Sequence, residues 1–118
     1  MGLDMFLYEK SYKNNKIELK EVAYFRKINS IHGWFVKNIQ DDIDNCAYYS
    51  LEGDSLRELH SLISKAIETK DASLIPPTKG FFFGSYEIDD YYWEDLQKAK
   101  TALSNLDFDK SYMYHSSW

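Results

Sequence analysis

The sequence is short of the residues that cross-link or interrupt a chain. Its 118 residues include one cysteine, two adjacent prolines and five glycines. The single cysteine, Cys46, excludes an intrachain disulfide, and the neighbouring Asp41, Asp42 and Asp44 disfavour a reactive thiolate there. No signal-peptide pattern is present, nor any apolar run long enough to span a bilayer. We therefore expect a cytoplasmic protein with no membrane partner.

Positive charge is also scarce. Fourteen Lys and Arg residues stand against nineteen Asp and Glu, which gives a formal net charge of -5. Nucleic acids and anionic membranes are bound by clustered cations that displace counterions. Nucleic acid is therefore not an expected partner.

A catalytic or metal-binding signature is missing. His32, His60 and His115 are far apart in the sequence, and none has a second ligand at a spacing typical of a metal site. The acidic residues around Asp89 and Asp90 are better explained as the start of a helix. We predict a protein with no metal, no cofactor and no catalytic residues, and so not an enzyme.

Aromatic residues are what the chain has in excess. Ten Tyr, seven Phe and three Trp make up 17% of the residues. Such rings bury large areas in a core or at an interface. The length fits one compact domain over residues 1–118, and we expect some rings to remain on its surface.

The spacing of apolar residues predicts the elements. Period-two alternation predicts strands, with Leu3, Met5 and Leu7 opposite a mostly aromatic face that includes Phe6 and Tyr8. Period-3.6 spacing predicts helices. The expected strands are residues 1–10, 46–51 and 110–115, with 17–22 as a short strand or a lead-in to a helix. The expected helices are residues 23–40, a segment that begins near the capping-box pair Ser55 and Glu58, and a segment that begins at Asp89 or Asp90.

These elements predict an α+β fold, with a small antiparallel sheet of about four strands and about three helices packed on one face. A mainly helical domain with a minor hairpin is the alternative. Residues 69–79 are the expected loop, and the GFFFG block at residues 80–84 is read as a short buried aromatic strand.

The stretch from Ala23 to Gln40 carries the strongest helical signal. It contains Gly33, which suggests either a close approach of another backbone or a kink beneath Trp34. His32 shares an apolar stripe with Ile28 and Phe35, so a core histidine with a hydrogen bond is favoured over a catalytic base.

Several motifs together resemble a group of small, largely uncharacterised proteins encoded by bacteriophages and prophages. They are the opening MGLDM, the central AY-x-RK-x-N-x-IH-x-WF of residues 23–35, the GFFFGS block at 80–85 and the final SSW. The resemblance runs nearly end to end, but it brings no established chemistry. It implies an accessory protein of a phage or prophage in the cytoplasm of a bacterial host. Proteins of this size and origin often bind and disable a host or defence component, as anti-CRISPR proteins do.

Our first hypothesis is therefore a non-catalytic binding protein that inhibits a host or antiphage-defence protein. Large aromatic and arginine side chains are enriched where interfaces carry their energy. The expected contact residues are Arg26, Trp34, Lys37, Trp93 and Trp118.

Two alternatives remain open. One is a protein or small enzyme that binds or sequesters a nucleotide-like molecule in a pocket, which requires its side chains to converge on one cavity. The pocket residues would be Tyr8, Tyr24, Arg26, Asn29, His32 and Phe83. The other alternative is a homo-oligomer, as a self-assembling structural or regulatory subunit, because exposed aromatics also form contacts between copies.

Overall fold

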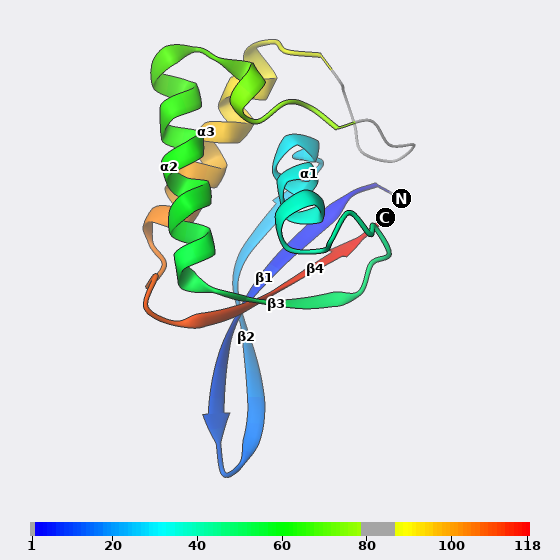
Figure 1. The fold of residues 1–118 in the computed structure, drawn as a ribbon, viewed down its shortest axis with the longest axis vertical. Coiled ribbons are helices and arrows are strands. Elements are labelled where there is room, and N and C mark those ends of the chain that lie inside the picture. The colour runs from blue at the N-terminus through cyan, green and yellow to red at the C-terminus, as the bar shows by residue number, and fades with distance from the viewer. Residues whose placement is uncertain (1, 79–86) are drawn as a thin grey trace.

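The computed structural model describes residues 2–78 and 87–118. Its elements run in mixed order along the chain (Figure 1). The strands are β1 (Asp4–Lys13), β2 (Lys16–Arg26), β3 (Tyr48–Glu52) and β4 (Ser111–Ser117), and the helices are α1 (Asn29–Asn38), α2 (Gly53–Thr69), the 3₁₀ turn η1 (Ala72–Leu74) and α3 (Asp90–Ser104).

The four strands form one antiparallel sheet in the order β2-β1-β4-β3. The helices α1, α2 and α3 all lie on the same side of this sheet (Figure 1). The predicted α+β class, with an antiparallel sheet and helices on one face, is confirmed. The first strand of the chain is paired on both sides, because β1 lies between β2 and β4.

The hairpin of β1 and β2 extends away from the helices, at the bottom of the view in Figure 1. Its turn is formed by Asn14 and Asn15, whose φ angles of 53° and 63° are both left-handed. Asn tolerates this region, and two such residues make the turn whose twist matches a hairpin. A bulge between Leu7 and Tyr8 interrupts the register.

The prediction of one helix from Ala23 to Gln40 is wrong over its first third. Residues 23–26 finish β2, and α1 begins only at Asn29. Ala23 and Phe25 are buried while Tyr24 and Arg26 are exposed, which is the alternation of a strand. Lys27, with a φ of 56°, then breaks the strand before the helix.

The predicted start of α3 is confirmed, whereas the predicted start of α2 is wrong. Asp89 caps α3 as predicted, because its side chain accepts a hydrogen bond from the Tyr92 N–H at 3.1 Å. The capping-box prediction at Ser55 and Glu58 is wrong, since α2 already begins at Gly53 and has no side-chain cap. The predicted GFFFG strand lies outside the described residues.

The core lies between the sheet and the helices. From the sheet it takes Leu3, Met5, Leu7, Tyr112 and Tyr114, which alternate with outward-facing neighbours. The helices supply the matching apolar stripes, including Ile31, Phe35, Leu59, Ile63, Leu96 and Leu103. The ring of Phe35 stacks on that of Tyr114 with centroids 3.8 Å apart and planes 4° apart, which fixes α1 against β4.

Candidate functional site

The outer face of the sheet carries a row of four rings, one from each strand. Strand pairing places Tyr24 of β2 beside Phe6 of β1, Phe6 beside His115 of β4, and His115 beside Tyr48 of β3. Directly opposite residues of antiparallel strands point to the same side of a sheet. We call these four residues the outer ring row.

The rings of the row contact one another across the strands. Centroids are 5.3 Å apart for Tyr24 and Phe6, 5.8 Å for Phe6 and His115, and 4.1 Å for His115 and Tyr48. The two inner members are half-buried, but Tyr24 is 48% exposed and Tyr48 is 55% exposed. The row therefore presents preordered aromatic surface to solvent at both ends.

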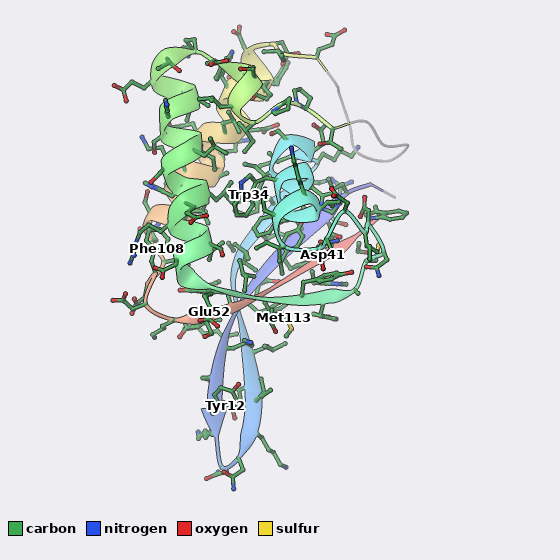
Figure 2. All side chains as sticks on the ribbon, viewed as in Figure 1. Tyr12, Trp34, Asp41, Glu52, Phe108 and Met113 are labelled. Carbon is green, nitrogen blue, oxygen red and sulfur yellow. The ribbon has the colours of Figure 1, made fainter. Side chains whose placement is uncertain are left out.

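A second row beside the first is mixed in character. Here Glu21, Tyr8, Met113 and Ser50 lie opposite one another on successive strands. Figure 2 shows Met113 on the side of the sheet away from the helices. The Tyr8 ring stands 6.3 Å from Phe6 and 6.1 Å from Tyr48, so it extends the outer ring row toward the hairpin.

Charged groups flank the rings. Arg26 pairs with Asp4 at 3.2 Å, and the Tyr24 hydroxyl donates a hydrogen bond to the same carboxylate. This bond to Asp4 raises the pKa of Tyr24, and partial burial raises the pKa of Tyr8, so both hydroxyls stay protonated donors at neutral pH. An aromatic centre with a polar margin is the usual anatomy of a protein interface.

The projecting hairpin continues this face. Tyr12 lies opposite Ile17 and Lys10 opposite Leu19, on the same side as Tyr8 because side chains alternate along a strand. Tyr12 is 73% exposed and Ile17 is 57% exposed. Figure 2 shows Tyr12 on the arm, far from the helices. The other side of the hairpin is polar, so the arm has one apolar face with no packing partner in the described part of the chain.

Charge is unevenly distributed between this region and the rest. Residues 1–27 hold six Lys and Arg against four Asp and Glu, a net charge of +2, whereas residues 28–118 carry a net charge of -7. The hairpin is therefore the basic end of an acidic protein.

A second group of polar residues surrounds His32, inside the core. His32 is fully buried, with Nδ1 2.6 Å from the Tyr114 hydroxyl and Nε2 3.0 Å from Asp44 Oδ1. The indole N–H of Trp118 donates to the same Asp44 oxygen at 3.0 Å. Burial lowers the pKa of His32, although Asp44 opposes this shift, and burial raises the pKa of Tyr114 well above its usual value.

The lowered pKa keeps His32 neutral at neutral pH. In the tautomer that satisfies both bonds, Nε2–H donates to Asp44 and Nδ1 accepts from the Tyr114 hydroxyl. The arrangement resembles a catalytic relay in its bonds, but both rings are fully buried and no substrate can reach them. The interpretation of His32 as a core histidine agrees with this geometry.

The predicted contact residues lie in different places. Arg26 borders the outer ring row. Trp34 and Lys37 line a pocket on the helix side, and Trp93 packs on Tyr92 of α3 beneath the ammonium of Lys70. Trp118 is held at Asp44. The structure brings only Trp34 and Lys37 together.

The predicted nucleotide pocket is not assembled by the residues the structure describes. Tyr8, Tyr24 and Arg26 are on the outer face of the sheet, whereas His32 is in the core on the opposite side. Asn29 is also buried, and its side-chain oxygen accepts from the Thr78 backbone N–H at 3.0 Å. Phe83 lies outside the described residues.

Another segment does approach Gly33 closely, but through the side chain of Thr78 and not through a backbone. A Cβ at this position would stand 1.9 Å from the side-chain oxygen of Thr78. The segment after η1 is thus held against α1 at Asn29 and Gly33.

Among residues 2–78 and 87–118, no group of three or more His, Cys, Asp and Glu side chains could hold a metal ion. No helix in these ranges is long and apolar enough to cross a membrane. Known proteins give no further guide. The chain matches no family model, no curated protein and no solved structure.

The sequence reasoning missed three members of the outer ring row. Phe6, Tyr48 and His115 were assigned to strands, and the aromatic side of the first strand was recognised, but none was singled out as a contact residue. The signal available in the sequence was an aromatic ring at an outward position of each predicted strand. These rings form one surface only when the register places them opposite one another.

Proposed function

We propose that this protein is a non-catalytic binding protein that docks a partner protein on the outer face of its sheet. The observation that carries the proposal is the outer ring row, a continuous set of contacting aromatic rings from all four strands that no described helix covers. Monomeric soluble proteins rarely leave such a contiguous patch without a use.

The charges of this face favour a protein over a nucleic acid as its partner. Asp4 and Glu21 stand beside the rings and offset Arg26 and Lys10, so the face has no excess of cations to neutralise phosphates. A partner with an apolar centre and mixed charges at its margin fits better.

The resemblance to phage-encoded proteins supplies the biological side of the proposal. On that basis the partner is a host or antiphage-defence protein in the bacterial cytoplasm, and binding would inhibit it, as anti-CRISPR-like or other counter-defence proteins inhibit their targets. The hairpin, with net positive charge and an exposed apolar face, would extend the contact onto an acidic part of the partner.

The test is affinity purification from the bacterial host, followed by measurement of binding to each purified candidate. Tyr24→Ala and Tyr48→Ala remove the two exposed ends of the outer ring row. The matched control is Tyr91→Ala, because Tyr91 is 74% exposed on α3, on the helix side. We expect a partner whose binding is lost in the first two variants and kept in the control.

Three results would overturn the proposal. One is a partner whose binding survives both outer-face variants. Another is binding lost only in Tyr91→Ala. The third is a concentration-dependent increase in mass by light scattering that both outer-face variants abolish, which would make the face a homo-oligomer contact.

A further inference from the structure

A pocket of about 330 Å³ lies between α1, α2 and η1, on the side of the molecule opposite the outer ring row. Its walls include Ser30, Trp34 and Lys37 of α1, Leu62 of α2, and Ile75 and Pro76 after η1. Figure 2 shows the Trp34 side chain extending from α1 toward α2. The volume is at the lower end of the range for small-molecule sites.

The pocket differs in charge from the rest of the chain. The sequence has nineteen acidic residues, yet none of the described residues that line this pocket is Asp or Glu. Lys37 is the one charged residue of the lining, and its ammonium group forms no ion pair within the described residues. Asp71, two residues before Ser73 of the lining, already accepts hydrogen bonds from the backbone and hydroxyl of Ser73. The lining therefore favours an anion.

A hydroxyl group stands at the other end of the pocket. Ser30 lines the pocket wall and is only 4% exposed as a residue. A hydroxyl can both donate and accept a hydrogen bond, so this group is suited to bond a polar atom of a ligand. Ser30, Trp34 and Lys37 follow one another at helical spacing on one side of α1, and seven residues of helix span roughly 10 Å.

Trp34 lies between these two polar ends. It is half-buried, and its ring meets that of Phe35 edge to face at 5.2 Å and 87°. Because Phe35 is fully buried against Tyr114, the indole is held in place from behind. A flat ring could pack on the indole with Leu62 and Ile75 around it.

We propose that this pocket binds a small organic anion that contains a flat ring. The ring lies against Trp34, the anionic group pairs with Lys37, and a polar atom at the far end of the ligand bonds the Ser30 hydroxyl. The phosphate of a nucleotide and the carboxylate of an aromatic acid share this chemistry. The site is separate from the outer ring row, so it stands or falls independently of the proposed protein partner.

The experiment follows the indole N–H signals of the full chain in ¹H–¹⁵N NMR spectra during titration with AMP, adenosine, inorganic phosphate and indole-3-acetate. We expect AMP or indole-3-acetate to shift the Trp34 signal while those of Trp93 and Trp118 stay in place. AMP alone would identify a phosphate preference, and indole-3-acetate alone a carboxylate preference. Adenosine and phosphate should bind more weakly than AMP, because each lacks one half of the recognised pair.

Lys37→Met removes the cation from an exposed position, where it leaves the fold intact. It should weaken binding of the anion by roughly tenfold, the usual loss for one charge-assisted hydrogen bond. Lys13→Met is the matched control, since it makes the same charge change on the hairpin, and it should bind as the unmodified chain does. The proposal is overturned when neither anion shifts the Trp34 signal at millimolar concentration, or when Lys37→Met and Lys13→Met bind equally well.

Discussion

Strand β4 carries two aromatic stacks of similar geometry on opposite faces. Inside, Tyr114 stacks on Phe35 with centroids 3.8 Å apart, and both rings are fully buried. Outside, His115 stacks on Tyr48 at 4.1 Å, but Tyr48 remains 55% exposed. Burial of a large apolar side chain contributes about 1.5–3 kcal/mol to stability, so the inner stack holds the fold together. The outer stack loses less area to folding, because Tyr48 keeps more than half of its surface exposed for a partner.

The largest expected effect is on the inner stack. Phe35→Ala removes the ring that connects α1 to β4 and should lower the free energy of unfolding by about 3–5 kcal/mol, because a cavity is left in a packed core. Urea titration followed by circular dichroism would measure the change. A loss below about 1 kcal/mol would show that α1 can collapse onto the sheet without this ring, and the distinction between the two faces would then fail.

A smaller effect is expected when only the hydrogen bond between Tyr114 and His32 is removed from the core. Tyr114→Phe keeps the stacked ring but leaves His32 Nδ1 without its donor in the core, which should cost about 1–3 kcal/mol. Tyr24→Phe makes the same change on the outer face, where water replaces the lost bond, and should alter stability by less than about 0.5 kcal/mol. Equal losses in the two variants would contradict the assignment of His32 as a buried, neutral acceptor at Nδ1.

The buried His32 should also make the stability of the fold depend on pH. Burial holds the pKa of His32 below its usual value of 6.5, so the unfolded chain binds a proton at a pH where the folded chain does not. The contribution is fully present above pH 6.5 and is lost as the pH falls below that value, with a slope of at most about 1.4 kcal/mol per pH unit. Urea titrations between pH 7.5 and pH 5.5 would show this loss.

His60→Gln is the control for this pH dependence. His60 hydrogen-bonds Ser104 at 2.8 Å and takes no part in the bonds of His32, so its replacement leaves the His32 network in place. If the slope disappears in His60→Gln, or if NMR shows the His32 ring gaining a proton at or above pH 6.5, His32 does not cause it.

The two faces of the sheet also differ in how much of their structure the sequence predicts. Local alternation was enough to separate Leu3, Met5 and Leu7 from Phe6 and Tyr8, because the side of a strand is set by neighbouring residues. The α+β class followed from the same periods. At Ala23–Arg26, however, apolar residues satisfy both a strand and a helix period, and only pairing with Asp4–Leu7 decides for the strand.

The candidate sites depend on contacts that a sequence pattern does not contain. The outer ring row requires the β1–β2 and β4–β3 registers to align at Phe6 and His115, and a shift of one residue would turn the rings inward. The bulge at Leu7 and Tyr8 adds to this dependence. Likewise, the pairing of His32 with Asp44 and Tyr114 joins the α1 region to β4, which lies 82 residues further along the chain. Residue types could be predicted here, but not their convergence.

Only a small effect on stability is expected where the effect on binding is largest. Tyr24→Ala combined with Tyr48→Ala trims both exposed ends of the outer ring row and should change the free energy of unfolding by less than about 1 kcal/mol, because neither ring is enclosed by the fold. Urea titration checks the stability, and binding to the partner identified by affinity purification checks the function. A double variant that unfolds readily would mean that the outer rings stabilise the sheet itself. A stable double variant with lost binding would instead show that the exposed ends of the outer ring row, in β2 and β3, serve recognition, whereas folding depends on the rings packed on the other face of the same sheet.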